Sequence, residues 1–150
     1  MKSQTRMMPP TYFAIAIAIM ICLHFILPEA QLVYGGWRLL GILIIAIGFA
    51  IPFSAKVMFG RKGTPMKPFS QATELVQNGP YRWTRNPMYL GLVIMLTGFG
   101  ICLGTLLPFI IIPPFIVLID RRVIVVEEKM LREIFGEAYD NYCKQVRRWI

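Results

Sequence analysis

Apolar residues occur along this chain in long uninterrupted blocks rather than in the stripes of a soluble amphipathic helix. Two blocks cover residues 12–27 and 39–55. Each is about as long as a helix needs to cross the ~30 Å hydrocarbon core of a bilayer. A third block, residues 88–119, contains no charged residue. The pattern predicts an all-α protein built as an integral membrane helical bundle.

The third block does not fit a single helix. Its 32 residues would make one helix too long for the bilayer core and two helices that are each short. Glycines and prolines interrupt it, and the pair Pro113-Pro114 disfavours an unbroken helix. We therefore expect a short hairpin of two spans, residues 88–104 and 105–119.

Polar segments complete a single membrane-embedded domain over residues 1–150. A polar loop at residues 56–87 separates the second span from the third. In the tail, residues 120–150, apolar positions recur at helical spacing between charged ones. We expect one tail helix that stops near Gly136 and a second, shorter helix over residues 138–146. The predicted architecture is about four membrane helices followed by a helical tail.

Basic residues indicate the orientation of the chain in the membrane. Sixteen lysines and arginines stand against eight acidic residues, for a net charge of +8. They gather before the first span, in the loop and in the tail, and Arg38 alone falls on the other side. Because cytoplasmic segments are enriched in basic residues, we expect both termini and the loop in the cytoplasm, which requires an even number of spans. The charge therefore indicates contact with anionic membrane lipid and no nucleic-acid partner.

Cysteine and histidine usage excludes several kinds of site. The three cysteines show no paired or zinc-binding spacing, and two of them lie within apolar blocks. The only histidine, His24, also lies within an apolar block. We expect no metal site and no Ser-His-Asp triad, and we interpret the cysteines as small apolar side chains.

Three clusters remain as candidates for chemistry. The first is TELVQNGPYRWTRNPMYLG at residues 73–91, the second is the pair Gly98 and Gly100, and the third is the charged tail. Each has an ordinary structural explanation: interfacial arginines and aromatic rings, close helix packing at glycines, and a solvated pair in Glu127-Glu128. Together they place carboxylates, tyrosine rings and arginines near one membrane interface, with a glycine-lined cleft that lies deeper and is open to lipid.

Such a combination suits S-adenosylmethionine. Its sulfonium would be favoured by Glu127 and by the ring faces of Tyr81 or Tyr89. The glycines at positions 98 and 100 would let the adenosine lie against backbone. A soluble methyltransferase would instead show a G-x-G-x-x-G loop after a strand, which this sequence lacks.

Residues 75–146 resemble the isoprenylcysteine carboxyl methyltransferase family, which is related to the phospholipid N-methyltransferases. The family pattern L-V-x-x-G-x-Y-x-x-x-R-H-P-x-Y-x-G is matched by LVQNGPYRWTRNPMYLG. The later pattern E-E-x-x-L-x-x-x-F-G-x-x-Y-x-x-Y is matched by EEKMLREIFGEAYDNY. The resemblance implies a membrane-embedded methyltransferase that uses S-adenosylmethionine without a metal, with a donor pocket open to the cytosol and an acceptor pocket open to the bilayer.

Carried over by position, the resemblance implies which residues bind the donor and which serve the acceptor. The donor-binding residues are Thr73, Glu74, Leu75, Val76, Tyr81, Arg85, Asn86, Pro87, Met88, Tyr89, Gly98, Gly100 and Glu127. The catalytic candidates are Arg122 and Glu128. Glu128, Phe135, Gly136 and Tyr139 would also shape a tail helix that acts as a lid.

Two positions depart from the family pattern. Asn86 replaces the family's histidine; it keeps hydrogen-bonding capacity but does not titrate. Val123 occupies the position of an arginine that grips the acceptor carboxylate in the eukaryotic enzymes, and Arg122 lies one step away. One step turns a helical side chain by about 100°, so the acceptor site is less well defined than the donor site.

The sequence leaves several alternatives for the methyl acceptor. A carboxylate is ionised at neutral pH and needs no general base, which favours carboxyl O-methylation of an isoprenylcysteine-like or other lipophilic substrate. A phospholipid amine is mostly protonated and would need a base, for which Glu128 is the candidate. A small thiol is a further acceptor. The alternative from another class is a non-catalytic four-span protein that binds lipid or a partner through its basic face.

Overall fold

The computed structural model describes residues 8–26, 35–61 and 75–150, and most of these residues are helical. The α-helices are α1 (Pro9–Ile26), α2 (Arg38–Arg61), α3 (Pro87–Leu103), α4 (Ile112–Ile119), α5 (Val125–Phe135) and α6 (Glu137–Gln145). Shorter helical turns are η1 (Gly35–Trp37), η2 (Gly79–Arg82), η3 (Leu107–Ile111) and the π-type turn η4 (Asp120–Ile124). These residues form no strand, and the predicted all-α class is confirmed.

Two helices of the described part, α1 and α2, are long and apolar enough to cross a membrane, and α3 is a shorter apolar helix. α2 continues to Arg61, six residues beyond the predicted end of the second span, because Lys56 does not interrupt it. The number of spans and the side on which each terminus lies stay predictions.

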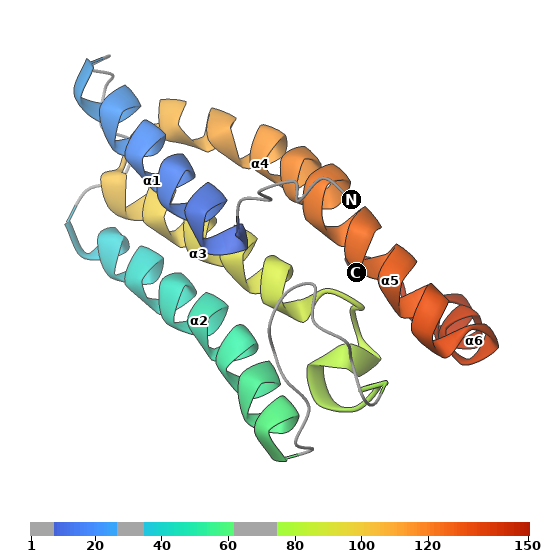
Figure 1. The fold of residues 1–150 in the computed structure, drawn as a ribbon. Coiled ribbons are helices and arrows are strands. Elements are labelled where there is room, and N and C mark those ends of the chain that lie inside the picture. Colours follow the sequence, from blue (N-terminus) through green and yellow to red (C-terminus); the bar gives the residue numbers. More distant parts are fainter. Residues whose placement is uncertain (1–7, 27–34, 62–74) are drawn as a thin grey trace.

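The chain reverses after α3 and then continues as one helical rod. α3 ends at Gly104, whose φ of 78° lies in the left-handed region that favours glycine. From Leu107 to Phe135 the chain is helical through η3, α4, η4 and α5 (Figure 1). The transition from span to tail, expected at residue 120, consists of five residues of π-type helix. This geometry is frequent at functional sites.

Glycines bring α2 and α3 into close contact. A Cβ added to Gly98 would lie 2.7 Å from the carbonyl oxygen of Gly41, and one added to Gly91 would lie 2.6 Å from that of Gly48. The obstructing atoms belong to backbone and cannot rotate away. Small residues that allow such approach are the usual means by which helices associate in a membrane.

The other side of α3 carries the buried core. Tyr89 and Leu96 pack there against residues of α1 and of the helical rod, namely Ala16, Met20, Phe115, Ile119, Val123 and Ile124. In consequence α3 is the central helix, with α2 on one side and the α4–α5 rod on the other (Figure 1).

We expect that Gly98→Val lowers the free energy of unfolding by about 1–3 kcal/mol, the usual effect of overpacking. The new side chain would meet the backbone of Gly41 and Ile45 at 2.7–2.8 Å. Thermal unfolding of the purified protein in mild detergent measures the change. Gly36→Ala is the control, because nothing lies within 4 Å of a Cβ at that position; equal melting temperatures for both variants would contradict the packing role.

Candidate active site

Residues 78–86, which we call the entry turn, lead the chain into α3. Gly79 has a φ of 61°, and a Cβ at this position would collide with the Met58 sulfur of α2. Pro80 is the second residue of η2, and Pro87 begins α3. At the start of a helix, proline lacks only an N–H that would have no intrahelical partner. The prolines and the glycine thus fix the path of the entry turn.

The C-terminal segment, residues 147–149, lies along the entry turn and is held by hydrogen bonds to it. The Arg85 N–H donates to the Arg147 carbonyl at 3.0 Å. The Thr84 hydroxyl and the Asn86 side-chain amide both donate to the Arg148 carbonyl, at 3.1 and 3.0 Å. Asn86, which replaces the family's histidine, therefore holds the C-terminal segment in place.

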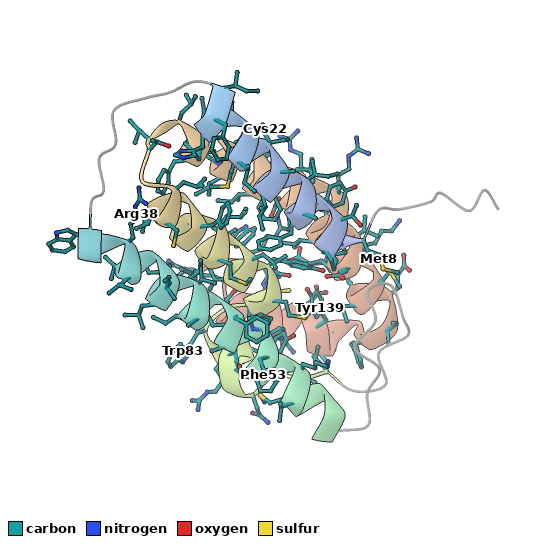
Figure 2. All side chains as sticks on the ribbon, turned by 90° about the vertical axis from the view of Figure 1, so that its left-hand side faces the viewer. Met8, Cys22, Arg38, Phe53, Trp83 and Tyr139 are labelled. Carbon is teal, nitrogen blue, oxygen red and sulfur yellow. The ribbon has the colours of Figure 1, made fainter. Side chains whose placement is uncertain are left out.

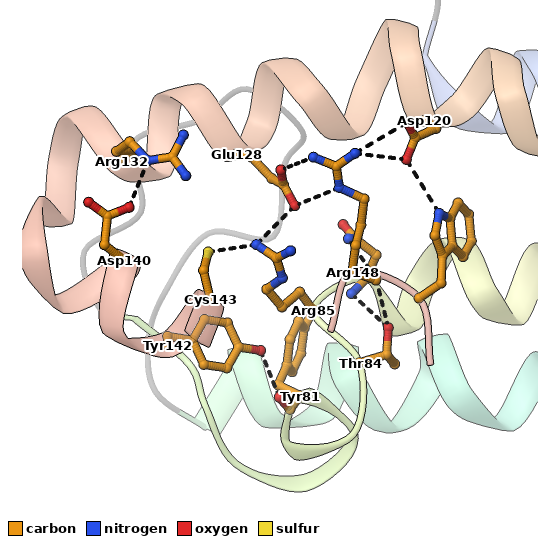
Figure 3. A network of polar contacts seen from close by, with 12 residues as sticks. Tyr81, Thr84, Arg85, Asp120, Glu128, Arg132, Asp140, Tyr142, Cys143 and Arg148 are labelled. Carbon is orange, nitrogen blue, oxygen red and sulfur yellow. Dashed lines mark hydrogen bonds and ion pairs between the residues drawn. The ribbon is translucent and has the colours of Figure 1, made fainter. Parts of the chain in front are cut away.

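Four charged side chains link this segment to the helical rod (Figure 3). The Arg148 guanidinium donates to both oxygens of Glu128, at 3.1 and 2.5 Å, and lies 3.3 Å from an Asp120 oxygen. Arg85 lies 3.2 Å from Glu128 and also donates to the Cys143 sulfur. We call Arg85, Asp120, Glu128 and Arg148 the ion network; its two positive and two negative charges balance.

Glu128 is the most buried member, with a side chain only 9% exposed. A carboxylate so far from water is tolerated when it is paired and hydrogen-bonded. Two arginines satisfy that requirement, so the structure uses Glu128 to hold the C-terminal segment. This arrangement leaves Glu128 poorly placed to take a proton from an acceptor, the catalytic role expected from the sequence.

Glu127, the neighbouring residue, lies in a different environment. Its carboxylate accepts a hydrogen bond from the Tyr89 hydroxyl at 2.8 Å. No ion pair to it is formed by any residue of the described part of the chain. On the same side, the Tyr142 hydroxyl donates to the Tyr81 carbonyl at 2.6 Å and ties α6 to the entry turn. Glu127 is thus a half-buried acid that faces tyrosines, and no residue of the described ranges forms an ion pair with it.

Burial is the main cause of the shifted pKa of the Glu127 carboxyl. It raises the pKa of Glu127 from 4.5 to about 7, and the hydrogen bond from Tyr89 offsets only part of the increase. Burial also raises the pKa of Tyr81, with further contributions from Tyr142 and Glu127. Near neutral pH, Glu127 therefore lies close to the midpoint between its neutral and charged forms, so a nearby positive charge would shift it to the carboxylate.

Of the residues predicted to bind the donor, the structure brings Tyr81, Tyr89 and Glu127 together. Arg85 and Asn86 lie nearby but contact Glu128 and the Arg148 carbonyl instead. Pro87 and Met88 begin α3, where Pro87 lines a hollow on the side of α2. Leu75 and Val76 precede the turn, with Val76 buried, whereas Thr73 and Glu74 lie outside the described residues.

Three predicted residues lie apart from this group. Gly98 is nine residues beyond Tyr89, about 14 Å along the helix axis, and contacts α2. Gly100 faces the ring of Phe109, where a Cβ would come within 2.9 Å. Close helix packing accounts for both glycines. Arg122 is exposed, whereas Val123, at the position of the family's arginine, is buried in the core.

Sequence reasoning missed Asp120, Arg148 and Trp149. The Trp149 ring N–H donates to Asp120 at 3.3 Å, beside the contact with Arg148. One signal was available, because Asp120 is an acidic residue at the end of a long apolar block and such a residue needs a cationic partner. The partner itself, 28 residues away in the chain, has no local signature.

Comparisons with known proteins identify the family and the fold of the chain. A sequence model described as phospholipid methyltransferase matches residues 37–138. An uncharacterized protein from Haemophilus influenzae is 36% identical over 63 residues, which cover 42% of this chain and all of that protein. The solved structure of the eukaryotic intramembrane Ras methyltransferase, isoprenylcysteine carboxyl methyltransferase, has a TM-score of 0.69 and 21% identity.

The structural match covers 94% of this chain and 51% of that chain, so the protein spans about half the length of its solved neighbour. At this level of identity the likeness concerns the fold. The family match shows more than the fold, because the matched residues 37–138 include the entry turn, α3 and α5. The protein has the fold of an intramembrane methyltransferase, and the chain belongs to the phospholipid methyltransferase family.

Proposed function

We propose that the protein transfers a methyl group from S-adenosylmethionine to a lipophilic acceptor, and that the donor binds beside Glu127, Tyr89 and Tyr81. The observation that carries the proposal is the environment of Glu127. An acidic group that is largely desolvated and has no ion-pair partner among the described residues is unfavourable as a carboxylate, and a bound cation removes that cost. The sulfonium of S-adenosylmethionine supplies such a charge.

The surrounding residues fit the same ligand. Tyrosine rings attract a cation placed over their faces, and Tyr81 and Tyr89 flank the Glu127 carboxyl from the entry turn and α3. The Tyr89 hydroxyl holds one Glu127 oxygen at 2.8 Å. The carboxyl group is therefore oriented before a ligand arrives, which reduces the loss of entropy on binding.

The residues of the chain contribute mainly by orientation and by exclusion of water. When bound, S-adenosylmethionine supplies a methyl group made electrophilic by a positively charged sulfur. Glu127 and the tyrosines hold that charge at a fixed place, while the entry turn and the C-terminal segment limit access of water. Alignment of two reactants and exclusion of solvent lower the barrier of such a displacement by several kcal/mol.

For the acceptor we favour a carboxylate on a lipophilic molecule of the isoprenylcysteine type. A carboxylate has no proton to lose, and Glu128, the base expected from the sequence, is occupied by two arginines. The eukaryotic neighbour is named for carboxyl methylation of isoprenylcysteine, which supports this class. Positive charge for the acceptor would come from Arg122, since the charges of the ion network balance one another.

A phospholipid amine is the second candidate. The family description favours it, and one observation of the structure does as well. With a pKa of about 7, Glu127 is suited to accept a proton from an ammonium group near neutral pH.

Isothermal titration of S-adenosylmethionine into the full chain in mild detergent tests the proposal, followed by methyl transfer to prenylcysteine and phosphatidylethanolamine analogues. Saturable donor binding together with transfer to one analogue is the expected result. A folded, monodisperse protein that binds no donor would indicate the non-catalytic alternative, a membrane protein that binds lipid or a partner.

Donor affinity is expected to depend on pH through Glu127. A sulfonium favours the carboxylate, so binding below a pKa of about 7 must release a proton. Affinity should therefore fall as pH is lowered from 8 to 5.5, by at most about tenfold per pH unit, and level off at higher pH. Titrations in buffers of different ionisation enthalpy count the released protons; an affinity that is flat over this range would argue against Glu127 as the partner.

A further inference from the structure

A hollow of about 610 Å³ lies between the entry turn and α2. Its walls come from Ile51 of α2, from Pro80 and Trp83 of the entry turn, from Leu90 of α3 and from Trp149. They are mostly apolar, and the volume lies within the range of about 300–1,000 Å³ typical of sites for small ligands. We call this hollow the α2 pocket.

The α2 pocket is separate from the donor site. Pro87 and Leu90, three residues apart in α3, share a helix face and both line the pocket. Tyr89 is turned by about 100° from Leu90 and packs instead with the core against α1 and the helical rod. The entry turn and α3 thus lie between the pocket and Glu127.

One cation, Arg82, is present among the residues that line the pocket. Its side chain is exposed, and no acidic residue of the described ranges forms an ion pair with it. Beside it, Trp83 is 83% exposed. An exposed tryptophan next to an arginine is typical of the membrane interface, where the ring lies at headgroup level and the cation reaches lipid phosphates.

α2 also exposes aromatic rings on the outside of the bundle, on a face about 200° around the helix from Ile51. Phe49 and Phe53 of α2 are each more than half exposed and stack on one another. Phe53 and Trp83 both lie on the α2 side of the molecule (Figure 2). The predicted orientation places this end of α2 and the entry turn at the cytoplasmic leaflet, where anionic lipids concentrate.

We propose that the α2 pocket binds an anionic phospholipid of the cytoplasmic leaflet, with an acyl chain among Ile51, Leu90 and Trp149 and the phosphate at Arg82. The apolar walls match the acyl chain, and the exposed Arg82 side chain matches the negative headgroup. The lipid is a bound partner and not the methyl acceptor, because the pocket lies away from Tyr89 and Glu127. The proposal does not depend on donor binding or on methyl transfer.

Tryptophan fluorescence in lipid nanodiscs tests it with the full chain. Trp37→Phe leaves Trp83 and Trp149, both of which line the pocket. In one sample, a small fraction of phosphatidylglycerol in phosphatidylcholine carries brominated acyl chains, which quench tryptophan fluorescence. In a parallel sample of the same composition, the phosphatidylcholine carries the bromine instead. Comparison of the two gives the relative association constant of anionic over zwitterionic lipid at these tryptophans.

We expect a preference of about fivefold for the anionic lipid, the usual effect of one basic residue at a charged surface. Arg82→Gln should reduce it to about one, and Arg82→Lys should retain it. Arg121→Gln removes the same charge from the exposed surface of the rod and is the matched control, with no effect expected. Circular dichroism checks that each variant is folded.

A relative constant near one in the parent protein would overturn the proposal, as would an unchanged preference in Arg82→Gln. Loss of the quenching on addition of a lipophilic methyl acceptor would also overturn it, since the pocket would then belong to the acceptor. Failure to bind S-adenosylmethionine leaves these measurements unaffected, so the two proposals fail independently.

Discussion

Replacement of Arg148 by glutamine is expected to lower the free energy of unfolding by about 3 kcal/mol. The change removes the cation that contacts Asp120 and both oxygens of Glu128. Loss of one partner from a buried pair typically costs about 3–5 kcal/mol, because the other charge stays buried without compensation. We place the effect at the lower end, since the Arg148 side chain is 36% exposed and water screens part of the charge.

Thermal and denaturant unfolding in mild detergent would measure this effect. Arg147→Gln removes the same charge from an adjacent exposed side chain and should change stability little, since only the Arg147 carbonyl contacts the entry turn. Arg148→Gln combined with Asp120→Asn should recover part of the loss, because the remaining pair of Arg85 and Glu128 is then electrically neutral. A single variant as stable as the Arg147 control would show that the ion network contributes nothing to the fold.

Replacement of Glu127 by glutamine is expected to weaken S-adenosylmethionine binding by about 30- to 100-fold, as for the loss of one partner of a buried charged pair. Glutamine has the same shape, and its carbonyl oxygen can still accept the hydrogen bond from Tyr89. The protein should therefore fold normally. The expected loss comes from the charge, so the dependence of affinity on pH should disappear together with it.

Stability supplies an independent test of the same residue. A carboxyl whose pKa rises from 4.5 to about 7 on folding holds its proton more tightly in the folded state. Its contribution to stability is complete below about pH 4.5 and is lost as pH rises through about 7. Glu127→Gln should remove that decline, whereas Glu133→Gln, at an exposed position of α5, should retain it and bind the donor normally.

Glu127 and Glu128 show what the sequence alone does not distinguish. Both belong to the motif that carries the family resemblance, and both are acidic residues of one helix. Because they are about 100° apart around the helix, one meets Arg85 and Arg148 while the other meets Tyr89. The partners come from the entry turn, the start of α3 and the C-terminal segment, and no spacing in the sequence links these three.

The sequence alone also did not identify which arginine lies at the acidic residues of the rod. Counting along the helix placed Arg122 nearest to the family position, and the structure leaves it exposed. The guanidinium that does lie over the Asp120–Glu128 face comes from Arg148, at the end of the tail. Whether either residue contacts an acceptor stays a prediction.

The sequence by itself determined the class of the protein and most of its elements. Long apolar blocks must be covered by lipid or by other parts of the protein, whatever the tertiary arrangement. Glycine ends helices and proline begins them because of local steric effects. These effects act within a few residues, so Gly104, Gly136 and Pro87 were readable as helix boundaries. Tertiary structure decided which of the neighbouring acids is paired, which glycines pack against α2, and how the C-terminal segment closes on the entry turn. Those outcomes depend on contacts between residues about 20 to 60 positions apart, and their energies arise only once burial has removed water from the charges.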